Sequence, residues 1–508
     1  MAAAASIARR ADASARTTVW GTALLYGHDV VSVLVSFLLT PYIAATVGQY
    51  RFGLWSVIIS SISVLGILEL GLGPAVIKIA SEAVARDDLD DLHRTLASAC
   101  VLTAALALLV FALPAGLLLV ADQFRDAPLT REVRLAALLV AANMALSVLE
   151  GPLASLLYAF SRLKQLAAAR LAGLAIFAVV TVLSLRAGWG LIGLGAAWVA
   201  SQLARTLCDL AFAHRLIGLR FLRPRRLDPG KIRALWGFSS YSSLGTIAYL
   251  TVANADNMII GGAVGAAAVA AYAATYRVPA LGARLLRLMA SSLFPHFCRH
   301  SGAGQLESSR QAHRLLVSVS AGVGWSGAAL ALIAGREFVS AWITPEYFSG
   351  YPILLSAVLS MVAIGYIAAS QGVGMAWGKV RDVYLLSAAE AAVNIVLSLV
   401  LVGPLGPAGV AVATLAPQAL LSLLVLPRLV CRLVGDSVLL YYLSMLKSAA
   451  LFAAVALAGR ALVTAAGGGL WIALAVGVLA AALYALLYFA LILRPDERGQ
   501  LLRYSRIR

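Results

Sequence analysis

The chain repeats itself at a distance of 216 to 217 residues, and a repeat of this length restricts it to a duplicated architecture. Three pairs of segments carry the match, in the same order along the chain: 47–58 (VGQYRFGLWSVI) with 264–275 (VGAAAVAAYAAT), 158–164 (YAFSRLK) with 375–381 (MAWGKVR), and 190–202 (GLIGLGAAWVASQ) with 406–418 (GPAGVAVATLAPQ). Each match alone is weak, since small and apolar residues are common here. Three matches at nearly one offset indicate a duplicated unit.

The duplicated unit is expected to lie in a membrane. Of the 508 residues 61% are hydrophobic and 12% charged, and the mean hydropathy is +0.90. Apolar runs long enough to cross a hydrocarbon core of about 30 Å recur throughout. We expect an all-α polytopic membrane protein with about fourteen spanning helices: 20–47, 52–80, 95–121, 133–159, 167–185, 190–213, 234–263, 266–297, 314–335, 350–377, 383–403, 406–427, 447–466 and 470–493.

The offset places six helices in each repeat, and an even number inserts both repeats with the same orientation, as parallel repeats. The last two helices have no counterpart. The predicted organisation is a basic tail, a first lobe (helices 1–6), a basic linker, a second lobe (helices 7–12), helices 13–14 and a second basic tail: 1–19, 20–213, 214–233, 234–430, 431–493 and 494–508.

Basic residues predict the orientation, because Lys and Arg accumulate on the cytoplasmic side of bacterial membrane proteins. With the helices above, 28 Lys and Arg fall on one side and seven on the other. We therefore expect both termini and the linker to be cytoplasmic, in a multi-pass membrane protein. The net charge of +17 then reflects topology and contact with anionic lipid, so nucleic acid is not an expected partner.

Enzyme chemistry has no recognisable motif in this chain. A phosphate-binding loop, a paired His/Cys cluster and a nucleophile signature are all missing from the sequence, so we expect no catalytic residue, cofactor or metal. The outer connections are too short for the acidic catalytic loop of a membrane glycosyltransferase. The glycine-rich 70–74 (LGLGP) lies in an apolar run and predicts close helix packing or a bend.

Charged residues inside the expected membrane helices are the candidate functional residues, because each costs about 2.5–3.5 kcal/mol unless it is shielded. Arg277, Arg284 and Arg287 fall within about 80° of one another on one helix and form a cationic stripe. They must face protein, water or an anionic ligand, and we assign them to substrate binding. The alternative for Arg277 is an ion pair with Asp256.

Further intramembrane residues are candidates for coupling to H+ or Na+: Glu69, Asp29, His28, Asp256 and Glu390. At the repeat offset Glu69 aligns with Leu286, between two arginines of the stripe. Lys78, Arg205 and Asp209 lie toward the inner interface, where we expect them to extend to water and to carry little functional weight.

The segment 47–96 resembles the helix 1–3 region of bacterial polysaccharide flippases, which are related to multidrug and toxin extrusion transporters. The resemblance rests on FGLWS (52–56), ELGLGPAV (69–76) and the acidic-basic loop after them. It extends to AFSRLK (159–164), the fourteen-helix layout and the duplication, and so covers nearly the whole chain. The family often has Asp where this chain has Glu69.

This resemblance implies two six-helix lobes in a V around a central cationic cavity, in the bacterial cytoplasmic (inner) membrane. By alternating access such a protein flips a polyprenyl-pyrophosphate-linked oligosaccharide (the O-antigen or exopolysaccharide repeat unit) to the outer leaflet, for surface polysaccharide synthesis. The implied partners are that lipid-linked sugar, the bilayer, and a polysaccharide polymerase or glycosyltransferases. A lipid II flippase and a cation-coupled multidrug exporter of the same superfamily are the alternatives, although three arginines on one helix argue against cationic drugs.

Overall fold

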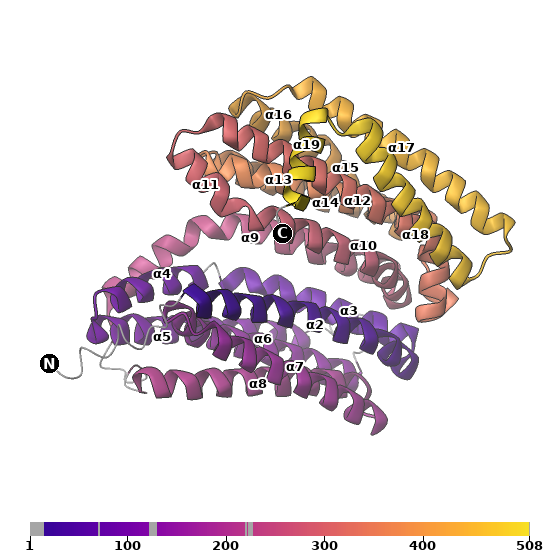
Figure 1. Ribbon diagram of the computed structural model, residues 1–508. Helices are drawn as coiled ribbons and strands as arrows, with labels where there is room; N and C mark the ends of the chain where they lie inside the picture. The colour runs from indigo at the N-terminus through magenta and orange to yellow at the C-terminus, as the bar shows by residue number, and fades with distance from the viewer. Residues whose placement is uncertain (1–14, 70–71, 121–129, 219–220, 222–226, 507–508) are drawn as a thin grey trace. The chain divides into compact units, whose positions relative to one another are not determined.

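Long α-helices make up the regular structure of residues 15–69, 72–120, 130–218, 221 and 227–506, which this computed structural model describes (Figure 1). Within these ranges there is no β-strand. The side chains of Glu69 and of residues 237–249 are outside the description. So are most of the N-terminal basic tail, part of the basic linker and the outer connection at 121–129.

The chain divides into two compact units, residues 1–254 and 255–508, with the division inside one helix, α9. The first unit contains α2 (Ala15–Val47), α3 (Gln49–Ser63), η2 (Val64–Glu69), α4 (Leu72–Ala85), α5 (Leu89–Val120), α6 (Arg131–Ala159), α7 (Leu163–Arg186), α8 (Gly190–Ile217) and most of α9 (Pro229–Ala263). Helices α6, α7 and α8 pack side by side (Figure 1). The predicted lobe boundaries in the linker stay a prediction.

The second unit continues with helices that pack around α12 and α13. Its elements are α10 (Ala266–Ser292), α11 (Phe294–Gly302), α12 (Leu306–Trp342), η6 (Pro345–Tyr347), α13 (Tyr351–Ala376), α14 (Val380–Leu405), α15 (Pro407–Pro417), η7 (Gln418–Ser422), α16 (Leu423–Leu433), α17 (Val438–Ala465), α18 (Leu470–Leu487), η8 (Tyr488–Ile492) and α19 (Pro495–Arg506). Trp325, Tyr366, Phe452 and Tyr484 are among the side chains of its core.

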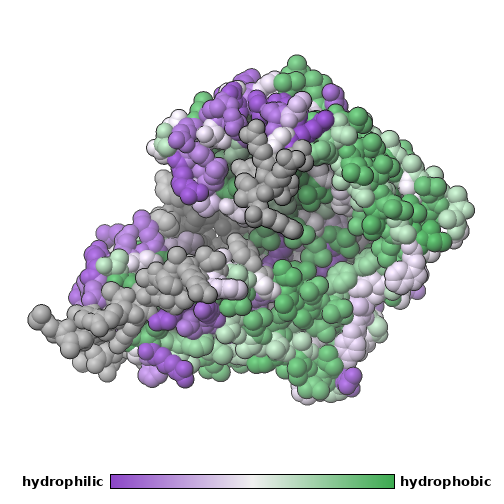
Figure 2. Space-filling view, in the orientation of Figure 1, coloured by the Kyte–Doolittle hydropathy of each residue, from purple (hydrophilic) through white to green (hydrophobic). Residues whose placement is uncertain are grey.

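Eleven helical segments of the described chain are long and apolar enough to cross a membrane. This confirms the all-α membrane class; the number fourteen stays a prediction. The space-filling view agrees with this class in the second unit, where the flank at α17 and α18 is apolar (Figure 2). Hydrophilic residues gather at the end that carries α11 (Figure 2). An apolar flank with a polar end is what a helix bundle in a bilayer requires.

The second predicted helix (52–80) is broken, which the apolar run did not indicate. The α-helix α3 ends at Ser63, a short 3₁₀ helix runs to Glu69, and α4 begins at Leu72. The 3₁₀ segment directly precedes the glycine-rich segment 70–74, of which Leu70 and Gly71 lie outside the described residues. Pro74 lies in the first turn of α4, where its missing N–H costs no helical hydrogen bond. Broken helices in membranes persist where protein or a water-filled cavity satisfies the free backbone groups.

The duplication is visible in the backbone of each unit, at positions 216 or 217 residues apart. Left-handed residues recur in equivalent places: Gly48 and Gly265 before α3 and α10, Ser161 and Gly378 after α6 and α13, Gly190 and Gly406 before α8 and α15, and Gly218 and Gly435. A positive φ is uncommon away from glycine. Four recurrences in order show that both units use the same turns.

Close helix contacts recur as well. A Cβ at Gly193 would lie 2.6 Å from Ser184 Oγ, where α8 meets α7. A Cβ at Gly409 would lie 2.2 Å from the carbonyl oxygen of Leu401, where α15 meets α14. Ser184 and Leu401 are themselves equivalent in the repeat. Small residues thus permit the same close approach in both units, as is common in membrane helix packing.

We expect Gly409→Ala to lower the stability of the second unit by about 1–3 kcal/mol, because the new methyl group meets backbone that cannot rotate away. Gly403→Ala, on α14, is the matched control, since no atom lies within 4 Å of its Cβ position. This control should be neutral or slightly stabilising. Thermal unfolding of both variants in one detergent measures the difference, and equal midpoints would contradict the packing role of Gly409.

Candidate functional site

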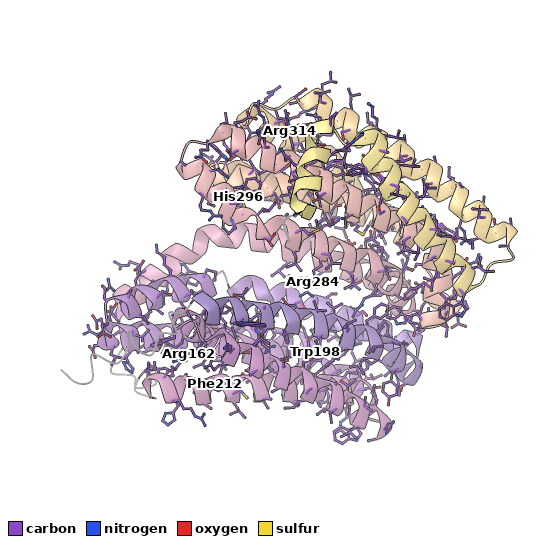
Figure 3. The ribbon with its side chains drawn as sticks, in the orientation of Figure 1. Arg162, Trp198, Phe212, Arg284, His296 and Arg314 are labelled. Atoms are coloured by element: carbon purple, nitrogen blue, oxygen red, sulfur yellow. The ribbon has the colours of Figure 1, made fainter. Side chains whose placement is uncertain are left out.

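The arginine stripe lies on α10, whose two faces differ sharply. Leu286 is 1% exposed and packs against Gly324 and Gly365 of the same unit. Arg284 and Arg287 are exposed, about 60° apart around the helix, and Leu286 lies about 200° from Arg284. Figure 3 shows Arg284 on this helix. The sequence therefore directs an apolar face of α10 into the second unit and leaves two guanidinium groups on its other face.

The ion pair considered between Arg277 and Asp256 stays a prediction, and the hydrogen bonds that Asp256 accepts come from hydroxyl groups. Asp256 accepts a hydrogen bond from the Tyr272 hydroxyl at 2.6 Å, and Thr414 Oγ1 lies 3.1 and 3.2 Å from its two oxygens. Neutral hydroxyl groups therefore hold this buried carboxylate, which is 8% exposed. Arg277 is partly buried and has partners of its own.

Oxygen atoms gather around Asp256 from α9 and α15. The carbonyl oxygen of Val410, one turn earlier on α15, lies 3.2 Å from Thr414 Oγ1. The Asn394 amide on α14 donates to Thr414 Oγ1 at 3.0 Å and to the Ala413 carbonyl at 3.2 Å. Carboxylate, hydroxyl and carbonyl oxygens are the ligands that hard cations prefer. This cluster can therefore accept a small cation. In the described chain, no group of three or more His, Cys, Asp or Glu residues could hold a metal ion.

Glu390 lies on α14 and accepts a hydrogen bond from the Ser422 hydroxyl. Ser422 ends the π-helical turn η7, which follows Pro417 and links α15 to α16. Arg287 is within electrostatic range of Glu390. The structure thus brings together two predicted residues that the sequence had assigned to different roles, substrate binding and ion coupling.

In the first unit His28 and Asp29 are adjacent on α2, and His28 Nδ1 lies 3.4 Å from Asp29 Oδ1. Arg170 and Arg205 are the cationic neighbours of this pair. The backbone of Glu69 ends η2, but its side chain lies outside the described residues. Its repeat equivalent, Leu286, faces the core of the second unit and does not share the arginine face. The role of Glu69 in ion coupling stays a prediction.

Asp209, which was expected to extend to the inner interface, does not, because it is fully buried. Arg205, expected at the same interface, is partly exposed and binds the buried carboxylate of Glu150 at 3.2 Å. Their position near the end of an apolar run gave no sign of this, because burial depends on which helices pack against α8. Tyr272, Thr414 and Asn394 were also missed. Tyr272 aligns with Trp55 in the repeat, and this was the one available signal for it.

The comparison with known proteins identifies both a family and a fold. The family described as polysaccharide biosynthesis protein matches residues 19–301, more than half of the chain. No curated protein matches. The lipid II flippase MurJ in an inward closed conformation is similar at a TM-score of 0.68 and 12% identity, over 94% of this chain and 100% of that one.

Two further solved structures share the fold. An inward-facing multidrug resistance MATE family transporter of the MOP superfamily has a TM-score of 0.63 at 16% identity, over 85% of this chain and 98% of its own. A MOP superfamily transporter from Pyrococcus furiosus has a TM-score of 0.54 at 16% identity, over 85% of this chain and 96% of its own. The chain belongs to the polysaccharide biosynthesis protein family and has the fold of the MurJ flippase and the MATE transporters.

Proposed function

We propose that this protein is a transporter, and not an enzyme, that flips a polyprenyl-pyrophosphate-linked oligosaccharide from the cytoplasmic to the outer leaflet of the inner membrane. The observation that carries the proposal is the exposed pair Arg284 and Arg287 on α10, in a member of a polysaccharide biosynthesis family. Two guanidinium groups exposed on one face of a membrane helix offer charge-assisted hydrogen bonds to an anionic headgroup. The headgroup of such a lipid carries a pyrophosphate.

The chemistry of the pair suits phosphate. Each guanidinium offers parallel N–H donors that match two phosphate oxygens, and such charge-assisted bonds offset the hydration that the pyrophosphate loses. Alternating access then moves the headgroup across the membrane while the lipid tail stays in the bilayer. An anion that leaves a negative interior gains about 2.3 kcal/mol per charge per 100 mV, which assists outward movement.

Both termini and the linker 214–233 should be cytoplasmic, as the charge asymmetry of the sequence requires. Single cysteines placed at residue 230 in the linker and at residue 346 in η6 should react from opposite sides with a membrane-impermeant thiol reagent, in a background without the four native cysteines. Labelling of residue 230 from outside intact cells would reverse the orientation, and with it the direction of transport.

We further propose that Asp256 couples transport to a cation. The oxygen cluster around Asp256 supports this role. A buried acid in a membrane helix is energetically costly, and such residues commonly have a function. Asp256→Asn should fold, because Tyr272 can still donate to the amide oxygen, but its flipping rate should no longer respond to Na+ or pH gradients. Glu346→Gln, at an exposed acid of the same unit, is the control and should keep the response. An unaltered gradient response in Asp256→Asn would remove Asp256 from coupling.

Depletion in the native host tests the substrate class. Loss of this protein should leave the lipid-linked sugar on the cytoplasmic leaflet and reduce surface polysaccharide, while peptidoglycan synthesis and resistance to cationic drugs stay unchanged. Lysis with accumulation of lipid II would favour the lipid II alternative. Drug sensitivity with normal polysaccharide would favour the multidrug exporter.

A further inference from the structure

A polar cluster buried between α6 and α8 of the first unit has no part in the proposed phosphate site. Glu150 on α6 is 4% exposed, and Gln202 and Asp209 on α8 are 3% and 0% exposed. Glu150 precedes the end of α6 by nine residues and Asp209 precedes the end of α8 by eight. At 1.5 Å per residue both lie about 12–14 Å from those ends, which face the same side of the membrane.

The two acids differ in their hydrogen bonds. Glu150 accepts from the Gln202 amide, and Arg205 Nη2 lies 3.2 and 3.3 Å from its two oxygens. Asp209 lies beside Glu150. Neither oxygen of Asp209 receives a hydrogen bond within the described part of the chain. A buried carboxylate without donors is among the most unfavourable groups in a protein interior.

The charges around the two acids come from every helix that packs on α8. Arg205 belongs to α8 itself, α7 contributes Arg170, and both arginines are near His28 on α2, which lies beside Asp29. The side chain of Asp29 is 36% exposed, so water can stabilise its charge. The two arginines offset the charges of the two acids, but in the described part of the chain no donor forms a hydrogen bond to Asp209.

The residue at position 173 on α7, a glycine, leaves room for the side chain of Arg205. A Cβ at Gly173 would lie 2.5 Å from Arg205 Cγ, so only glycine lets the arginine cross α7 toward Glu150.

We propose that Glu150 and Asp209 form a proton-binding site within the first unit. The proton resides on Asp209, whose O–H donates to the Glu150 carboxylate, while Gln202 and Arg205 hold the other lone pairs of Glu150. One proton thereby satisfies both acids. A metal cation fits less well, since it prefers six or more oxygen ligands and the contacts here come largely from N–H donors. Use of this proton in transport rests on the proposed function; its binding does not.

Infrared spectroscopy of the full-length protein in lipid nanodiscs tests the site directly. Wild type should show a C=O band of a protonated carboxyl at the pH of the transport assay, and Asp209→Asn should lose it. Asp436→Asn is the matched control: Asp436 is ion-paired with Arg314 outside this unit, so the band should persist. Persistence of the full band in Asp209→Asn would overturn the proposal.

A second variant covers the case in which Asp209→Asn does not fold. Glu150→Gln replaces the acceptor of the Asp209 O–H by an amide, so the band should shift in frequency, and an unshifted band would also overturn the site. Transport gives an independent readout: the dependence of flipping on a pH gradient should be lost in Asp209→Asn. If wild type shows the band but moves no lipid-linked sugar, the proposed function fails while the proton site stands.

Discussion

The double substitution Arg284→Ala, Arg287→Ala should abolish outward movement of the lipid-linked sugar, with the protein still inserted and folded. Both side chains are exposed on α10, and the packing of that helix depends on the opposite face, which contains Leu286. Removing them therefore costs little stability but leaves the pyrophosphate without its charge-assisted bonds, each of which contributes about 1.5–3 kcal/mol. Two such losses predict a fall in flipping rate of at least about a hundredfold.

Conservative substitution separates charge from geometry. Arg284→Lys with Arg287→Lys retains both charges but not the paired donors, so it should recover only part of the activity. Arg299→Ala removes an exposed arginine from the neighbouring helix α11 and should flip at the wild-type rate. Full activity in the double alanine variant would refute the phosphate assignment.

The second large effect concerns stability, at the ion pair between α12 and the connection that leads to α17. Arg314 donates to Asp436 through Nε at 2.8 Å and Nη2 at 2.5 Å, and the side chain of Asp436 is 5% exposed (Figure 3 shows Arg314). Arg314→Ala leaves this carboxylate buried without its partner. We expect a loss of about 3 kcal/mol in unfolding free energy, at the low end for buried pairs because Arg314 is partly exposed.

The loss should depend on pH. Burial alone would raise the pKa of the Asp436 carboxyl, but hydrogen bonds from Arg314 and from the Ser437 N–H outweigh it and hold that pKa below its usual value. A carboxyl with a depressed pKa stabilises the fold above its unfolded-state pKa, and this contribution disappears as pH falls through the folded-state value. The difference between wild type and Arg314→Ala should therefore shrink in acid.

Thermal unfolding at several pH values measures this difference. Arg94→Ala is the control, because Arg94 and Asp90 form an exposed ion pair on the surface of α5, and such pairs add little to stability. If Arg314→Ala were no more destabilising than Arg94→Ala at neutral pH, the Arg314–Asp436 pair would have no structural role.

The sequence predicted the helical architecture because its signals are local or repeated. Apolar runs mark helices in a bilayer whatever their neighbours, and the recurrence of Gly48 as Gly265, and of Gly190 as Gly406, indicated the duplicated unit whose turns share a positive φ. The cationic face of α10 was predictable for the same reason, since the spacing of Arg284 and Arg287 is a property of one helix.

The polar clusters could not be predicted, because each depends on packing between distant helices. Asp256 and Thr414 are 158 residues apart, and Glu150 and Gln202 are 52 apart. Nothing in the order of residues shows that α8 turns Asp209 toward α6 and away from water. The break between α3 and α4 was also missed, since glycine and proline in an apolar run permit either a continuous helix or an interruption.

Headgroup accessibility in sealed vesicles tests the flippase proposal most directly. Purified protein, reconstituted with the host's polyprenyl-pyrophosphate-linked repeat unit, is exposed to an impermeant glycosidase or lectin, and the accessible fraction is followed over time. The proposal predicts that wild type moves headgroups between leaflets, that the rate responds to membrane potential, and that the double alanine variant at Arg284 and Arg287 matches protein-free vesicles. Equal accessibility with wild type, with the double variant and without protein would contradict it.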